Sequence, residues 1–144
     1  MQAPPTIVVL AAGPGLRLGA GAPGRPHTAG DRPPLVATLQ HALQTGWPVC
    51  AVITPPLRPV VSPWIATRDL VVLEESEAAR GPGRAIAAGV AAQADATGWV
   101  VLPGDMPRVR PETLRAVGLA LADHPVAYAQ HQGRRGHPQA FAAE

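Results

Sequence analysis

The sequence contains no lysine, so all twelve strongly basic side chains are arginines. It therefore cannot form the Gly-Lys-Ser/Thr loop with which P-loop enzymes grip phosphate. The single cysteine, Cys50, excludes an internal disulfide and is expected to pack in the core of a cytoplasmic protein. Only 3% of the 144 residues are aromatic although 47% are hydrophobic, so the core must consist of alanine, valine, leucine and isoleucine.

Further absences narrow the partners that the chain could bind. The formal net charge is only +2, and the arginines are not interleaved with aromatic residues, which argues against nucleic-acid binding. The first residues contain no basic segment followed by a long apolar one, so we expect a protein that is neither secreted nor membrane-spanning. No Gly-x-Gly-x-x-Gly sequence runs into a helix, which disfavours a flavin or nicotinamide enzyme.

Five short apolar segments, separated by turns that contain many of the 15 glycines and 18 prolines, predict an α/β fold in one domain, residues 1–144. The predicted strands span residues 7–10, 49–54, 70–73, 99–102 and 126–130. Helices are expected from Pro33-Pro34, at residues 62–67, after Arg84 and from Pro111. The inner faces of the three longer helices are expected to carry aliphatic residues at helical spacing: Leu35, Leu39 and Leu43; Ile86, Val90 and Ala94; Leu114, Val117 and Leu121.

The alternation of strands and helices predicts a parallel sheet with right-handed crossovers. If the strand at residues 99–102 returns to lie beside the strand at residues 7–10, the carboxyl ends of the two strands flank a topological switch point. Ligands of open α/β sheets bind at such a point, so these two strand ends are where we expect a site.

A glycine-rich loop follows the first strand. Ala12, Gly13 and Gly15 carry almost no side chain, so their backbone N–H groups could approach a base or a phosphate closely. Arg17 and Arg25 add positive charge beside them. A simple tight turn would show the same spacing, so nucleotide binding and a structural turn both remain open at this point.

Three later segments are likewise open to both a functional and a structural interpretation. Asp105, directly after the strand at residues 99–102, could bind a hard divalent cation or cap the next helix. The glycine-rich segment at residues 81–84, which leads into the expected helix, could bind an anion or serve only as a loop. Arg134, Arg135 and His137 could contact a ligand, or the two arginines could lie in a solvated loop and His137 could be packed in a turn. The acidic residues 74–77 are predicted to form a solvated loop.

Two motifs together resemble a known family. The sequences Leu10-Ala11-Ala12-Gly13-x-x-x-Arg17-x-Gly19 and Leu102-x-Gly104-Asp105-x-Pro107 are similar to signatures of the MobA/MocA-like nucleotidyltransferases, and the first also to those of sugar-phosphate nucleotidyltransferases. Residues 133–138 resemble the Gly-Arg-x-Gly-His-Pro segment of the cytidylyltransferase branch. The resemblance implies a three-layer, Rossmann-like fold with a mostly parallel sheet and helices on both faces.

The resemblance also implies a reaction and its residues. A nucleoside monophosphate would pass from CTP or GTP to a phosphorylated acceptor, molybdopterin in the nearest relatives, with release of pyrophosphate. Arg17 and Asp105 would be catalytic, Asp105 as the Mg²⁺ ligand, while Arg135 and His137 would contact the acceptor. The implied nucleotide-binding residues are Leu10, Ala11, Ala12, Gly13, Gly15, Arg17, Arg25, Gly81 and Gly83.

Two alternatives stay open beside this interpretation. The acceptor could instead be a sugar or polyol phosphate. The chain could also be a non-catalytic nucleotide-binding domain, since Ala22 stands where the family has a lysine and Ala85 where it has a serine. Family members are expected to continue beyond the segment that ends here at Glu144. An α/β domain of this extent would leave a sheet edge or an apolar helix face that a second copy could bury in a homodimer.

Overall fold

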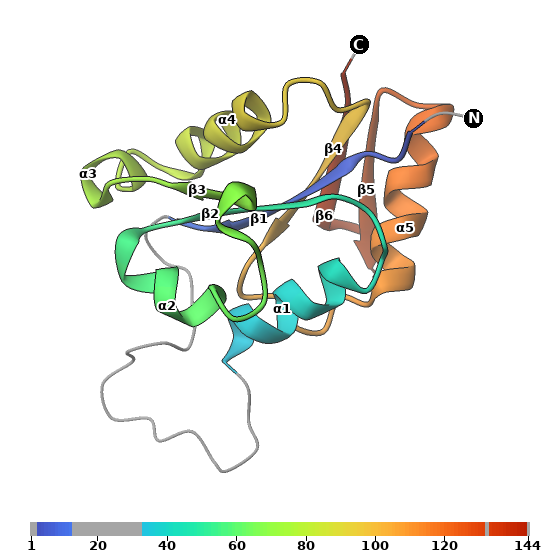
Figure 1. Cartoon of the computed structure of the whole chain (residues 1–144). Coiled ribbons are helices and arrows are strands. Elements are labelled where there is room, and N and C mark those ends of the chain that lie inside the picture. The colour runs from blue at the N-terminus through green and yellow to red at the C-terminus, as the bar shows by residue number, and fades with distance from the viewer. Residues whose placement is uncertain (1–2, 13–32, 132, 144) are drawn as a thin grey trace.

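One mixed sheet forms the centre of the computed structural model, which describes residues 3–12, 33–131 and 133–143. The strand order is β3-β2-β1-β4-β6-β5, and helices cover both faces (Figure 1). The strands are β1 (Thr6–Ala11), β2 (Val49–Ile53), β3 (Leu70–Val72), β4 (Gly98–Pro103), β5 (Val126–His131) and β6 (Arg134–Ala142).

The first four strands are parallel, and β1 lies between β2 and β4. Ile7 pairs in register with Val49 on one side and with Val100 on the other. Every residue of β1 and of β2 is buried, as the continuous apolar runs predicted for strands covered on both faces. The predicted return of the fourth strand to the side of the first is confirmed.

The antiparallel strand β6 was not predicted. It pairs with β4, where Trp99 faces Phe141, and with β5, which forms the edge of the sheet. The alternative of a solvated loop at Arg134 and Arg135 is therefore wrong in its conformation, because both residues, although exposed, belong to a strand. Polar residues and Pro138 hide this strand in the sequence, since proline is rare in strands with neighbours on both sides.

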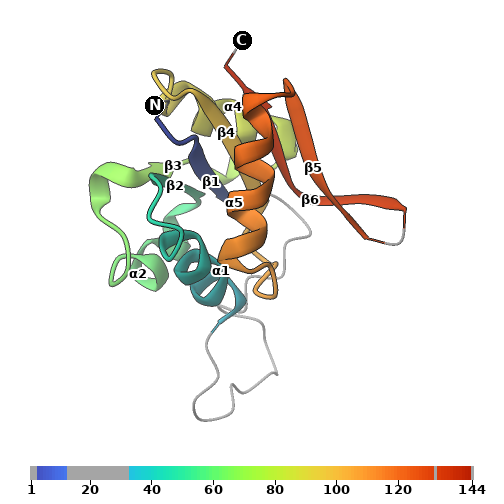
Figure 2. The same cartoon turned by 90° about the vertical axis from the view of Figure 1, so that its right-hand side faces the viewer.

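The helices form two layers. On one face, α1 (Pro34–Leu43), α2 (Arg58–Val61) and α5 (Pro111–Leu119) pack with Ile7 and Val9 of β1. On the other face, α3 (Glu75–Ala78) and α4 (Pro82–Ala92) pack with Val8 and Leu10. Figure 2 shows α1 and α5 side by side and the β5–β6 hairpin extending past them. Within the ranges that the structure describes, no helix has the length and apolar character needed to cross a membrane.

The helix predicted at residues 62–67 is misplaced. The observed helix α2 lies earlier and carries Pro59 in its first turn, where proline has no hydrogen bond to lose. In α1, Leu35 and Leu39 are buried as predicted, but Leu43 in the last turn is 37% exposed. Leu43 is the last residue of the helix, before the C-cap Gln44, and is not among the buried residues of α1.

The buried face of α4 also differs from the prediction. Ala85 and Gly89 are its buried residues, whereas Ile86 and Val90 lie at the margin of the core and Ala94 follows the helix and is exposed. The reason is a close approach to the sheet: a Cβ atom at Gly89 would lie 2.6 Å from Cγ1 of Val8. Only small residues fit between α4 and β1. In α5, Leu114 and Val117 are buried as predicted, and Leu121 is partly buried in the 3₁₀ helix that follows, Ala120–Ala122.

Candidate active site

The carboxyl ends of β1 and β4 lie side by side, as the switch-point argument requires. Leu10 pairs with Pro103, and the backbone N–H of Gly104 donates a 2.7 Å hydrogen bond to the carbonyl oxygen of Leu10. This bond joins two segments that are more than ninety residues apart in the sequence. The two predicted motifs are thus in direct contact, through Leu10 of the first and Gly104 of the second.

Part of the predicted nucleotide-binding set lies at this edge of the sheet. Leu10 and Ala11 end β1 and Ala12 follows directly, all three with buried side chains. Any contact that they make to a nucleotide must therefore come from the backbone. Four other members of the set lie outside the described residues: Gly13, Gly15, Arg17 and Arg25.

Asp105 lies in the turn after β4 and is half-buried. The N-cap of the next helix, α5, is Arg110, and this cap makes no side-chain hydrogen bond. Asp105 is therefore not the N-cap residue of α5. Within the part of the chain that the structure describes, no three His, Cys, Asp or Glu side chains gather into a metal site. One carboxylate is still compatible with Mg²⁺, which commonly binds one or two protein carboxylates together with substrate phosphates and water.

The loop that carries Asp105, residues 104–110, is fastened to the core. The side chains of Met106 and Val109 pack against the cluster around α1, and the N–H of Val109 donates to the carbonyl oxygen of Met106 at 3.3 Å. The Nδ1 atom of His41 lies 3.0 Å from the carbonyl oxygen of Val109. Sequence reasoning missed His41, because its partner is a backbone atom 68 residues away.

The start of α4 lies at the same edge, after the carboxyl end of β3. Gly81 is its N-cap with φ +115°, a conformation that favours glycine. A Cβ atom at Gly81 or at Gly83 would meet none of the described residues within 4 Å, so these residues leave the backbone of the turn open to a ligand. Ala85 is fully buried, so the position where the resembling family has a serine points into the core here.

The acidic segment at residues 74–77 is not the solvated loop that we predicted. Much of it belongs to α3, and Glu77 accepts a 2.7 Å hydrogen bond from Nε of Arg84. This bond, with a weaker contribution from Arg80 at 3.5 Å, lowers the pKa of the Glu77 carboxyl. Residues 74–76 are exposed as predicted, whereas Glu77 links α3 to the first turn of α4 through Arg84.

Arg135 and His137 are exposed near the start of β6. Because β6 runs antiparallel to β4 and Gln139 pairs with Val101, the residues before Gln139 lie toward the carboxyl end of β4. The guanidinium carbon of Arg135 lies 4.9 Å from the centre of the Tyr128 ring, a cation–π contact that restrains the side chain. Both residues therefore lie toward the carboxyl end of β4, the end that Asp105 follows.

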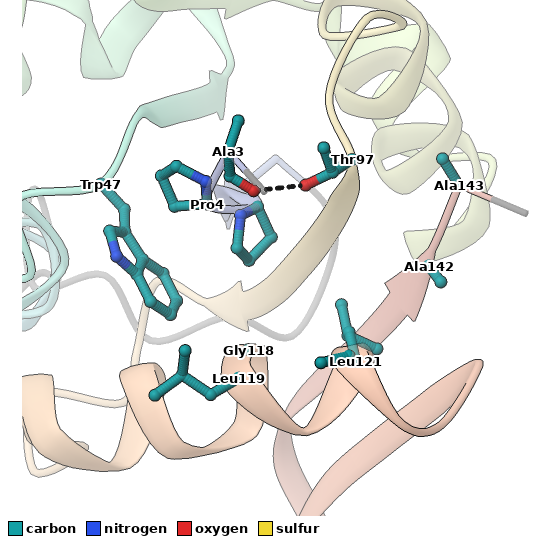
Figure 3. A pocket seen from close by; sticks show the side chains of 11 residues that line it. Ala3, Pro4, Trp47, Thr97, Gly118, Leu119, Leu121, Ala142 and Ala143 are labelled. Atoms are coloured by element: carbon teal, nitrogen blue, oxygen red, sulfur yellow. Dashed lines mark hydrogen bonds between the residues drawn. The ribbon is translucent and has the colours of Figure 1, made fainter. Parts of the chain in front are cut away.

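The described residues also line a cavity of about 870 Å³ at the opposite edge, near the amino ends of β1, β2 and β4. Pro4, Trp47, Leu119 and Ala142 are among its mostly apolar walls (Figure 3). The Thr97 hydroxyl in this lining donates to the carbonyl oxygen of Ala3 at 2.9 Å. The described residues that line this cavity include no charged side chain, so they offer a triphosphate no ionic partner.

Comparison with known proteins finds a family and solved structures that the chain resembles. Residues 7–144 match the MobA-like NTP transferase domain. The crystal structure of Rv0371c from Mycobacterium tuberculosis H37Rv in complex with manganese is 30% identical with a TM-score of 0.69, over 99% of this chain and 72% of that one. No curated protein sequence matches the chain significantly.

Two more distant structures share the fold alone. The nucleotidyl transferase Mth528 from Methanothermobacter is 19% identical with a TM-score of 0.66, over 96% of this chain and 71% of that one. The 4-diphosphocytidyl-2C-methyl-D-erythritol synthase from Anaerococcus prevotii is 15% identical with a TM-score of 0.70, over 96% and 69%. The family match and the likeness to Rv0371c together decide the assignment: the chain belongs to the MobA-like NTP transferase domain family.

Proposed function

We propose that the protein is a Mg²⁺-dependent nucleotidyltransferase that moves a nucleoside monophosphate from CTP or GTP to a phosphorylated acceptor, with molybdopterin as the first candidate. The observation that carries the proposal is the hydrogen bond from Gly104 to Leu10. It brings the loop that carries Asp105 against the strand end that leads into the glycine-rich loop. A nucleotide bound there would lie at the topological switch point.

The residues of this edge suit the groups of a nucleoside triphosphate. The backbone at Leu10, Ala11 and Ala12 would contact the base, and the first turn of α4 at Gly81 and Gly83 would form a wall of the site. Arg17 and Arg25 remain, from the sequence, the proposed phosphate-binding cations. The Asp105 carboxylate would hold Mg²⁺, which neutralises phosphate charge when bound.

The proposed chemistry is a displacement at phosphorus. An oxygen of the acceptor phosphate attacks the α-phosphorus of the triphosphate, a new P–O bond forms, and the bond to pyrophosphate breaks. No protein nucleophile takes part, so the chain has to align the reactants and stabilise the charge that moves to the leaving group. Arg135 and His137 are proposed to bind the phosphorylated acceptor.

One observation favours a second candidate, a nucleotide-binding domain without activity. Ala85 is fully buried and offers no hydroxyl group where the resembling family has a serine. This candidate predicts that the protein binds a triphosphate but releases no pyrophosphate from it.

The test is pyrophosphate release by the purified protein with Mg²⁺, CTP or GTP, and either molybdopterin or a panel of sugar and polyol phosphates. We expect release with one triphosphate and with molybdopterin. Release with a sugar or polyol phosphate alone would keep the chemistry and replace the acceptor. Triphosphate binding with no release under any combination would contradict the proposal and support the inactive domain.

A further inference from the structure

A long-range hydrogen bond connects helix α1 to the loop that carries Asp105. His41 is half-buried in the last turn of α1, and its Nδ1 atom lies 3.0 Å from the carbonyl oxygen of Val109. Because a carbonyl oxygen can only accept, Nδ1 must carry the hydrogen and donate it. The hydrogen bond to Val109 thereby restricts the orientation of the His41 imidazole ring.

This bond acts on a loop that is already fixed at its other end. At the start of the loop, Gly104 is hydrogen-bonded to Leu10 of β1 at 2.7 Å. Near its end, Val109 packs against the core and accepts from His41. Asp105 follows Gly104 directly, so its backbone lies in a segment that β1 holds on one side and α1 on the other.

We propose that His41 is a positioning residue that sets the affinity of the site for a metal–triphosphate complex, an inference that rests on the proposed function. The bond to Val109 restricts the positions open to the loop, and therefore the positions from which the Asp105 carboxylate can meet a cation. Binding is tighter when a ligand group is held in its bound geometry beforehand. His41 itself touches neither nucleotide nor metal in this account.

Two substitutions separate this role from simple packing. In His41→Asn, the side-chain amide nitrogen takes the place of Nδ1 at the same distance from the backbone and can still donate to Val109. In His41→Gln, the amide lies one bond farther out, near the place of Nε2, and the bond is lost. Both variants keep a polar, uncharged side chain. His124→Gln, at an exposed histidine before β5, is the matched control.

The experiment measures the Kd of the wild type and of the three variants for CTP or GTP, once with Mn²⁺ and once with EDTA. We expect His41→Gln to weaken binding of the manganese complex about five-fold, the value of one ordinary hydrogen bond. Binding of the metal-free triphosphate should not change, and His41→Asn and His124→Gln should match the wild type. A general packing defect would instead weaken both forms of the ligand.

Several outcomes would overturn the inference, and the experiment distinguishes failure of the His41 role alone from failure of the proposed metal role of Asp105. If the wild type releases pyrophosphate but His41→Gln binds the manganese complex as tightly as the wild type, or His41→Asn binds it as weakly as His41→Gln, the positioning role is wrong and the proposed function stands. If the wild type binds the manganese complex no more tightly than the metal-free triphosphate, the metal role of Asp105 fails and the role of His41 fails with it.

Discussion

The two edges of the sheet differ in what they offer a ligand. The carboxyl edge combines Asp105, the open first turn of α4 and exposed cations of β6, and these groups come from segments far apart in the chain. The amino edge has the 870 Å³ cavity, yet the walls of that cavity are mostly apolar and the Thr97 hydroxyl in them is already bonded. The cavity at the amino edge is therefore the poorer candidate for a nucleotide. The contrast illustrates that the chemistry of the lining residues, and not only the volume of a cavity, has to suit the ligand.

The most severe test of this contrast replaces a carboxylate at each end of one strand. Asp105 follows β4 at the carboxyl edge, and Asp95 precedes it at the amino edge. Asp105→Asn should lower Mg²⁺-dependent turnover on the order of 1,000-fold, because the proposed metal ligand loses its charge. Asp95→Asn should leave turnover unchanged. The measurement is kcat from pyrophosphate release, with the thermal midpoint as a check of folding.

Equal turnover in both variants would remove Asp105 from the chemistry. Equal losses in both would show that the two edges do not differ in the way described here.

The close packing of α4, which carries Gly81 and Gly83 to the carboxyl edge, depends on Gly89. Gly89→Ala places a Cβ atom 2.6 Å from Val8 and 3.1 Å from Val52, both buried strand residues. We expect the free energy of unfolding to fall by about 3 kcal/mol, the upper end for overpacking in a core. Urea unfolding measures it.

The matched control is the same substitution on the same helix. The new Cβ atom of Gly83→Ala meets no residue of the described part of the chain within 4 Å, so the substitution should preserve the free energy of unfolding or raise it by up to about 1 kcal/mol. If Gly89→Ala is as well tolerated as Gly83→Ala, α4 does not lie as close to β1 as the structure has it.

Cys50 reports on the core between the two edges. Burial, assisted by the negative charge of Asp69, raises the pKa of the Cys50 thiol from 9.0 to about 11. The unfolded chain therefore loses this proton at a lower pH than the folded protein does. The stability linked to the neutral thiol is complete below pH 9 and is lost as the pH rises toward 11. We expect the loss to be at most about 3 kcal/mol, and Cys50→Ala should remove that part of the slope between pH 9 and pH 11. An identical slope in the variant would assign it to other groups.

The smallest effect is expected at the amino edge. Leu119 lines the cavity but is 64% exposed, so Leu119→Glu should change the free energy of unfolding by less than about 0.5 kcal/mol. Turnover should match the wild type, since no reacting group lies there in this account. A ten-fold loss of turnover would give the amino edge a part in function and weaken the contrast between the edges.

The parallel half of the fold was predictable from the sequence. A strand covered on both faces has apolar residues at every position, and β1 and β2 show this as uninterrupted runs. The placement of β4 beside β1 followed from the two motifs, since only neighbouring strand ends could bring Asp105 close to Leu10. The observed hydrogen bond between Gly104 and Leu10 agrees with that argument.

The remaining features depend on contacts that no local pattern reveals. Strand β6 is polar at its start and becomes a strand by pairing with β4. The buried face of α4 is made of Ala85 and Gly89 because the helix approaches the sheet too closely for Ile86 to lie between them. His41 contacts a backbone oxygen whose position is set by the tertiary structure. The roles of Arg17 and Arg25 rest on the sequence alone.

The most direct test of the central claim is to locate the metal–triphosphate complex on the protein. Bound Mn²⁺ broadens the NMR signals of amides close to it, so the signals are recorded with the manganese complex of CTP or GTP and with the diamagnetic Mg²⁺ complex. We predict broadening at Leu10, Ala12, Gly104 and Asp105, with sharp signals at the amino edge. Broadening at Trp47, Thr97 and Leu119, with Gly104 and Asp105 unaffected, would contradict the account.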